Sequence, residues 1–230
     1  MLVAACGGPA PAPAETAPKK LRFAIIPKAL DIPVFNYAKI GAERQAQEFG
    51  DVEVLWNAPA SADQLKQKEI LESYITQRVD GIAISSLNGE FLADTINRAI
   101  DAGIPVTTWD SDAPTSKRIA FYGVDDLASG RIMGEQAITL LNGKGKVALI
   151  TSLGAANLQN RLQGVKDALA KAPGIEVVET YDIKEDAIRC AEIIATGSRR
   201  YPELSAWIWW AAGPCSRATR SPRSTLRRRK

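Results

Sequence analysis

Short apolar runs that alternate with helix-patterned stretches constrain the fold of this chain more than any other feature of its sequence. Each run has at most seven residues and is rich in Val and Ile, as is typical of parallel strands that are buried on both faces. We predict eight such strands, at residues 21–27, 52–56, 81–85, 104–109, 119–124, 146–151, 175–180 and 206–210.

The stretches between these runs carry apolar residues at the spacing of a helix face. One stripe comprises Phe35, Ala38, Ala42, Ala46 and Phe49. Another comprises Leu158, Leu162, Val165 and Leu169. Strands that alternate with helices form right-handed βαβ units around a parallel sheet, so the pattern predicts an α/β fold.

The alternation breaks once, between the runs at 104–109 and 119–124. Only residues 110–118 separate them, and a crossover helix needs about ten to twelve residues. The pattern resumes at Asp125 with a new series of helices and strands. We therefore predict two doubly wound parallel-sheet lobes, at residues 21–123 and 124–212, which leaves 1–20 and 213–230 outside both lobes.

The N-terminal segment 1–20 combines a cysteine motif with a Pro/Ala-rich stretch. Val3-Ala4-Ala5-Cys6 resembles a bacterial lipobox, whose cysteine carries a lipid, and the Pro/Ala stretch fits a tether. Only five residues precede Cys6, whereas a signal peptide needs an apolar region of 7–15 residues. Two interpretations stay open: lipid attachment at Cys6 with a start codon further upstream, or an accidental match.

The segment 213–230 switches abruptly to Arg, Ser, Pro and Thr. It carries six Arg and one Lys and no acid, so the rest of the chain has 22 basic against 26 acidic residues. It is either a basic tail for nucleic acid or membrane surfaces, or the product of out-of-frame translation, and we favour the latter. Because the body is acidic, we expect no nucleic-acid partner. Because the tail shows no periodicity, we expect it to be disordered.

Several kinds of catalytic site are excluded by composition. The sequence contains no histidine and three cysteines without metal-ligand spacing, and it has neither a dinucleotide-binding nor a Walker motif. Asp110 and Asp112 could form a glycosidase pair, but neighbours on one loop diverge, and hydrolases take their carboxylates from separate elements. We therefore expect a non-enzyme without metal or cofactor, and no apolar run long enough to span a bilayer.

Polar and aromatic residues follow several of the predicted strands, where ligands of parallel α/β sheets bind. Charged groups form strong hydrogen bonds with sugar hydroxyls, and aromatic rings cover the apolar faces of a sugar. The candidate ligand-binding residues are Lys28, Phe35, Asp110, Asp112, Gln159 and Arg161.

Each of the main candidates also has an ordinary structural explanation. Asp110 could be a helix N-cap or a turn residue, and Arg161 could lie on a solvated helix face. Lys28 could be a surface lysine, and Phe35 could be a core residue of its helix. These alternatives stay open at the level of sequence.

In combination, residues 21–210 resemble the type I periplasmic sugar-binding proteins, the ribose-binding-like solute receptors of ABC transporters. The motifs that carry the resemblance are Ile26-Pro27-Lys28, Pro33-x-Phe35, Val79-Asp80-Gly81-Ile82, Gly103-Ile104-Pro105-Val106-Thr107, Asp110-Ser111-Asp112 and Arg161-x-x-Gly164. The resemblance implies two hinged lobes that close on a monosaccharide. It places Phe35 against the sugar ring and Asp110 and Arg161 on its hydroxyls. The variants around Lys28 and Asp112 resemble the branch that binds rhamnose-type sugars or autoinducer-2.

The resemblance also implies partners and a location. We expect a monomer that binds a monosaccharide or related polyol and serves an ABC permease, in the periplasm or lipid-anchored through Cys6 at the outer face of the cytoplasmic membrane. Because the family continues beyond the eighth strand, we expect a C-terminally truncated chain with an incomplete second lobe that binds sugar weakly or not at all. An alternative is the effector-binding core of a lac-repressor-type transcription regulator without its DNA-binding domain.

Overall fold

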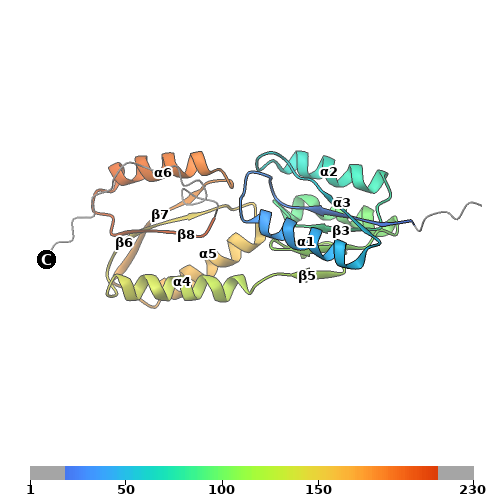
Figure 1. Ribbon diagram of the computed structural model, residues 1–230. Coiled ribbons are helices and arrows are strands. Elements are labelled where there is room, and N and C mark those ends of the chain that lie inside the picture. The colour runs from blue at the N-terminus through green and yellow to red at the C-terminus, as the bar shows by residue number, and fades with distance from the viewer. Residues whose placement is uncertain (1–18, 212–230) are drawn as a thin grey trace, which may run out of the picture.

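The computed structural model describes residues 19–211, which form two α/β lobes lying end to end (Figure 1). The first sheet has the strand order β2-β1-β3-β4-β5 and the second has the order β7-β6-β8. All pairs of neighbouring strands are parallel. The predicted α/β fold with two parallel sheets is therefore confirmed.

All eight predicted strands occur, with ends that differ from the prediction by a few residues. The strands are β1 (Leu21–Ile26), β2 (Val52–Trp56), β3 (Gly81–Ile84), β4 (Val106–Trp109), β5 (Ala120–Tyr122), β6 (Gly145–Thr151), β7 (Ile175–Asp182) and β8 (Ala206–Trp209). The helices are α1 (Phe35–Phe49), α2 (Gln64–Thr76), α3 (Gly89–Asp101), α4 (Asp126–Leu140), α5 (Ala156–Leu169) and α6 (Ala187–Arg200). Within residues 19–211, no helix is both long and apolar enough to cross a membrane.

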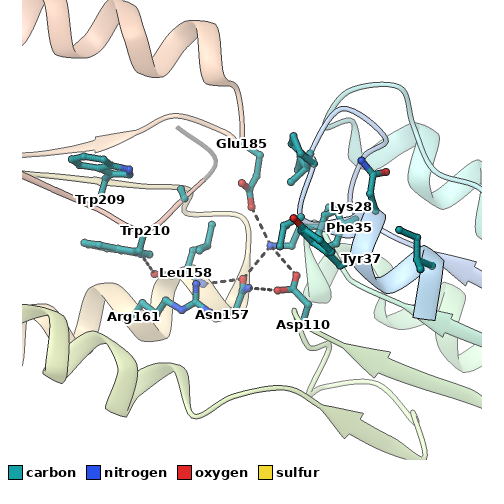
Figure 2. A pocket seen from close by; sticks show the side chains of 16 residues that line it. Lys28, Phe35, Tyr37, Asp110, Asn157, Leu158, Arg161, Glu185, Trp209 and Trp210 are labelled. Carbon is teal, nitrogen blue, oxygen red and sulfur yellow. Dashed lines mark hydrogen bonds and ion pairs between the residues drawn. The ribbon is translucent and has the colours of Figure 1, made fainter. Parts of the chain in front are cut away.

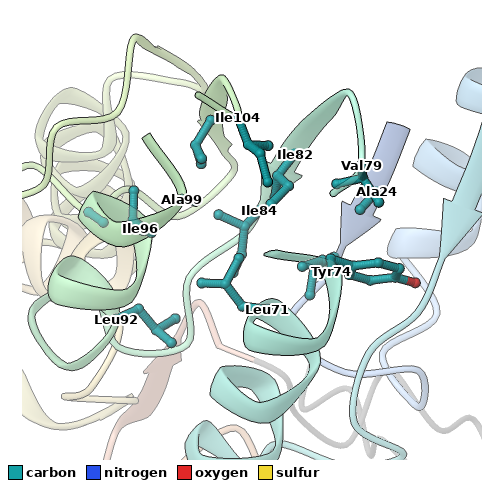
Figure 3. Close-up of a cluster of buried hydrophobic side chains, with 13 residues drawn as sticks. Ala24, Leu71, Tyr74, Val79, Ile82, Ile84, Leu92, Ile96, Ala99 and Ile104 are labelled. Carbon is teal, nitrogen blue, oxygen red and sulfur yellow. The ribbon is translucent and has the colours of Figure 1, made fainter. Parts of the chain in front are cut away.

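The core of the first lobe lies between its sheet and the helices α2 and α3. Ile84 of β3, Leu71 of α2 and Ile96 of α3 are fully buried in one cluster (Figure 3). Burying one such side chain contributes about 1.5–3 kcal/mol to folding. This layer fixes the strands whose carboxyl ends face the second lobe.

The core of the second lobe forms around the central strand β6, whose apolar run Val147–Ile150 is fully buried. The predicted stripe on α5 packs against it, and its four members are all buried: Leu158, Leu162, Val165 and Leu169. The stripe predicted for α1 is only partly correct. Phe35 is buried, but Phe49 is 65% exposed because it occupies the last position of α1, just before the left-handed Gly50.

The chain leaves the first sheet after Tyr122 and enters α4 at Asp126. Helices α4 and α5 then cross at very short distance, at positions without side chains. A Cβ atom added to Gly130 would lie 2.1 Å from the carbonyl oxygen of Arg161, and one added to Gly164 would lie 2.1 Å from that of Leu127. These glycines allow the two backbones to touch. The contact fixes the position of α5, which carries Arg161, against α4.

Candidate functional site

A cavity of about 770 Å³ lies between the two lobes. This volume is within the range of small-molecule sites. Both lobes contribute side chains to it (Figure 2). The polar and aromatic residues that matter most are Lys28, Phe35, Tyr37, Asp110, Asn157, Arg161, Glu185, Trp209 and Trp210.

Most of the polar residues in the cavity follow the carboxyl ends of parallel strands, as expected for a ligand site of this fold. Lys28 follows β1, Asp110 follows β4 and Glu185 follows β7. Asp110 and Glu185 have the positive φ angles 59° and 58°. Such left-handed backbone is uncommon for residues other than Gly and concentrates at functional sites.

Lys28 connects the two lobes through its ammonium group. Its Nζ atom donates to Asn157 Oδ1 at 3.1 Å and to Glu185 Oε1 at 3.0 Å, both in the second lobe. The same atom lies 3.8 Å from Asp110 Oδ2 in its own lobe. Lys28 is 3% exposed, so it is not a surface lysine, and its buried charge is balanced by these partners.

Asp110 faces both its own lobe and the cavity. Ser85 Oγ donates to its Oδ2 atom at 2.7 Å, and Asn157 Nδ2 lies 3.5 Å from its Oδ1 atom. The side chain is 33% exposed, so part of the carboxylate remains accessible from the cavity. No helix begins at Asp110, which excludes the helix N-cap as the explanation of this residue.

Arg161 is held by a carboxylate from the beginning of α4. Its Nε atom lies 2.8 Å from Asp126 Oδ1, but the N–H group does not point at the oxygen, so the contact is an ion pair. Burial raises the pKa of Asp126, and the attraction of Arg161 offsets only part of that effect. Arg161 thus lines the cavity rather than lying on a solvated helix face.

Aromatic rings form the apolar walls of the cavity. Phe35 contacts Trp109 edge to face, with ring centroids 5.4 Å apart, and belongs to a small buried cluster with Ala29 and Ile32. It is therefore a core residue and a cavity residue at once. On the second lobe, Trp210 is buried and its Nε1 donates to the carbonyl of Leu158 at 3.1 Å.

Two predicted site residues do not lie in this cavity. Asp112 turns back into the first lobe, where Arg118 binds both carboxylate oxygens at 2.5 and 2.6 Å. Burial alone would raise the pKa of Asp112, but hydrogen bonds from Arg118, Thr108 and the Ala113 N–H lower it below its ordinary value. Gln159 is exposed and donates to the carbonyl of Leu153.

Other predictions lie outside this geometry. Cys6 falls outside the described residues. Five of these cavity residues were not among the sequence-based candidates: Tyr37, Asn157, Glu185, Trp209 and Trp210. Glu185 lies on the loop after β7, and Asn157 lies in the first turn of α5, the helix that follows β6. Both obey the same strand-end rule that identified Lys28, so the signal for them was present. Among residues 19–211, no group of three or more His, Cys, Asp or Glu could hold a metal ion.

Comparison with known proteins gives consistent matches. Residues 23–221 match the family described as periplasmic binding protein domain. The chain is 28% identical over 204 residues to the D-ribose/D-allose-binding protein of Pseudomonas aeruginosa. The match covers 85% of this chain but only 63% of that protein's length. A xylose/arabinose-binding protein of Sulfolobus acidocaldarius is 26% identical over 147 residues, or 59% of this chain and 37% of that protein.

Solved structures resemble the chain in the same way. An ABC transporter solute-binding protein of Burkholderia graminis, in complex with D-arabinose, matches with 37% identity and a TM-score of 0.78 over 84% of this chain and 66% of that one. A glucose-galactose binding protein of Geobacillus stearothermophilus matches with 30% identity and a TM-score of 0.80 over 86% of this chain and 71% of that one.

Proposed function

The chain belongs to the periplasmic binding protein domain family, and on this premise we propose that it is a receptor that captures a monosaccharide or a related polyol between its lobes. The relatives are named for binding ribose, allose, xylose and arabinose. In this proposal the protein binds its ligand without chemical change and delivers it to an ABC permease outside the cytoplasm.

The observation that carries the proposal is the composition of the interlobe cavity. Asp110 on one lobe and Arg161 on the other both line it, and Phe35 and Trp210 supply apolar surface. A sugar hydroxyl both donates and accepts hydrogen bonds, so a carboxylate and a guanidinium group on opposite walls suit it. Aromatic rings suit the C–H faces of the sugar ring.

Capture then follows from the two-lobe arrangement. A ligand that contacts both lobes at once binds the closed arrangement more tightly than an open one, so it shifts the population towards closure. We assign Asp110 as an acceptor for sugar hydroxyls, Arg161 as a donor and Phe35 as a ring contact. Asp126, at the beginning of α4, pairs with Arg161 and so orients its guanidinium group.

Lys28 in the cavity supports the branch that binds rhamnose-type sugars or autoinducer-2, whereas Asp112, outside the cavity, does not. Lipid anchoring at Cys6, truncation and weak sugar binding stay predictions. The chain spans 63% of the length of the Pseudomonas relative, so delivery to a permease also stays a proposal.

Isothermal titration calorimetry of the 230-residue chain tests the proposal, with D-ribose, D-allose, D-arabinose, D-xylose, D-glucose, D-galactose and L-rhamnose up to about 50 mM, since millimolar affinity still yields about 4 kcal/mol of binding free energy. We expect at least one sugar to give saturable heat that is lost in Asp110→Ala. Asp51→Ala, an exposed carboxylate in the turn before β2, is the matched control. Absence of saturable heat for every sugar would overturn the proposed function.

A further inference from the structure

The contact between Lys28 and Glu185 spans the two lobes inside the cavity. Lys28 Nζ lies 3.0 Å from Glu185 Oε1, and the two side chains are 3% and 6% exposed (Figure 2). Glu185 also borders a second cavity of about 330 Å³, formed by loops of both lobes. Its carboxylate therefore stands in the wall between two interlobe spaces.

The loop after β7 holds Glu185 in place. Lys184 and Glu185 have consecutive left-handed φ angles of 52° and 58°. The Glu185 N–H donates to Ser152 Oγ at 2.7 Å, and Asp182 Oδ1 accepts from the N–H groups of Lys184 and Leu153 at 3.0 and 3.2 Å. A strained backbone persists only where its surroundings over-determine it, so the position of this carboxylate is set by the loop.

Within residues 19–211, each cation at the cavity has a carboxylate partner. Glu185 forms an ion pair with the ammonium group of Lys28, and Asp126 forms one with the guanidinium group of Arg161. Asp110 contributes a further negative charge 3.8 Å from Lys28. These five groups sum to one net negative charge when all are ionised. Without Glu185, Lys28 would offer its ammonium group to an incoming anion, and the five positions would be neutral.

We propose that Glu185 is a specificity-determining residue that makes the cavity reject anionic sugars, such as uronic acids, in favour of neutral ones. It acts by occupying Lys28 across the cleft and by adding a like charge against a ligand carboxylate. Selectivity of this kind arises from a repulsive element as well as from attractive contacts. The inference rests on the proposed function, because it concerns which sugars the same cavity accepts.

The test compares neutral sugars with the acids that differ from them only at C6. Dissociation constants are measured by calorimetry for D-glucose against D-glucuronate and for D-galactose against D-galacturonate, in the unaltered chain and in Glu185→Gln. Glu192→Gln removes the same charge from an exposed position on α6 and is the matched control. For the unaltered chain, we expect the acid to bind at least about tenfold more weakly than the neutral sugar.

In Glu185→Gln this ratio should fall at least about tenfold, whereas Glu192→Gln should keep it. Adding Lys28→Gln to Glu185→Gln should cancel the gain, because the gain depends on the freed ammonium group. An unchanged ratio in Glu185→Gln overturns the inference while leaving the proposed function intact. Equal affinity of the unaltered chain for acid and neutral sugar overturns it even if the variant does not fold. If neither hexose nor any other neutral sugar binds, the proposed function fails with it.

Discussion

Asp110 and Asp112 stand two residues apart on one loop after β4, yet their carboxylates have different partners. Asp110 faces the cavity and meets Asn157 of the second lobe. Asp112 points back into the first lobe and is enclosed by Arg118 and Thr108. The backbone decides the difference, because Asp110 adopts a left-handed φ of 59° and turns the loop between them.

The comparison separates two kinds of carboxylate contact. The partners of Asp112 all belong to its own lobe, so these contacts persist however the lobes move. The contact of Asp110 with Asn157 exists only when the lobes are together. We infer that Asp112 contributes to folding of the first lobe, whereas Asp110 contributes to ligand binding and closure.

Replacing Asp110 should give the largest effect on binding. We expect Asp110→Ala to weaken sugar affinity by roughly a hundredfold, because hydrogen bonds to a charged group contribute about 1.5–3 kcal/mol. Calorimetric titration with the sugar that the unaltered chain binds checks this. If affinity falls by less than threefold, Asp110 does not contact the ligand and the comparison with Asp112 collapses.

Replacing Asp112 should instead lower stability. Asp112→Asn removes one partner of a half-buried, bidentate Arg118 pair, and we expect the free energy of unfolding to drop by about 2 kcal/mol. Sugar affinity should stay within about twofold, since the residue lies outside the main cavity. Urea unfolding and calorimetry on the same preparation measure both quantities. A large loss of affinity with unchanged stability would reverse the assignment of the two carboxylates.

The pH dependence of stability should sharpen the same distinction. The pKa of Asp112 is lowered in the folded chain, so its stabilising contribution is complete above the unfolded value of about 3.9 and is lost as the pH falls through the folded value. The difference in unfolding free energy between the unaltered chain and Asp112→Asn should therefore become smaller as the pH is lowered from about 5 to about 2, because Asp112 becomes protonated over this range. A difference that grows on acidification contradicts the pairing with Arg118.

The smallest effect is expected at Gln159, two residues before Arg161 on α5. Its side chain is exposed and hydrogen-bonds only with the Leu153 carbonyl among the contacts of the described chain. Gln159→Ala should change the free energy of unfolding by less than about 0.5 kcal/mol and leave affinity unaltered. A tenfold loss of sugar affinity in this variant would show that Gln159 reaches the ligand after all.

The sequence predicts the fold well because the fold depends on local periodicity. All eight strands and the apolar stripe of α5 follow from patterns of Val, Ile and Leu within short windows. The position of the cavity follows as well, because parallel strands place their carboxyl ends at one edge. Lys28, Phe35, Asp110 and Arg161 line this cavity, and their part in ligand binding stays a prediction.

The strand-end rule also points to Asn157 and Glu185, but the contacts of the site depend on backbone direction and on the meeting of distant segments. Spacing on a loop does not reveal that a left-handed residue sends Asp110 and Asp112 apart. Nor does it reveal that Glu185 meets Lys28, 157 residues away in the sequence. Trp209 and Trp210 belong to the apolar run 206–210 that predicts a strand, and only the tertiary arrangement brings them to the cavity.

A crystal structure of the chain grown with its tightest-binding sugar would test the central claim most directly. We predict a sugar ring between Phe35 and Trp210 with a hydroxyl group donating to the Asp110 carboxylate and Arg161 donating from the opposite lobe. A sugar bound elsewhere, or one that contacts a single lobe only, would contradict the account.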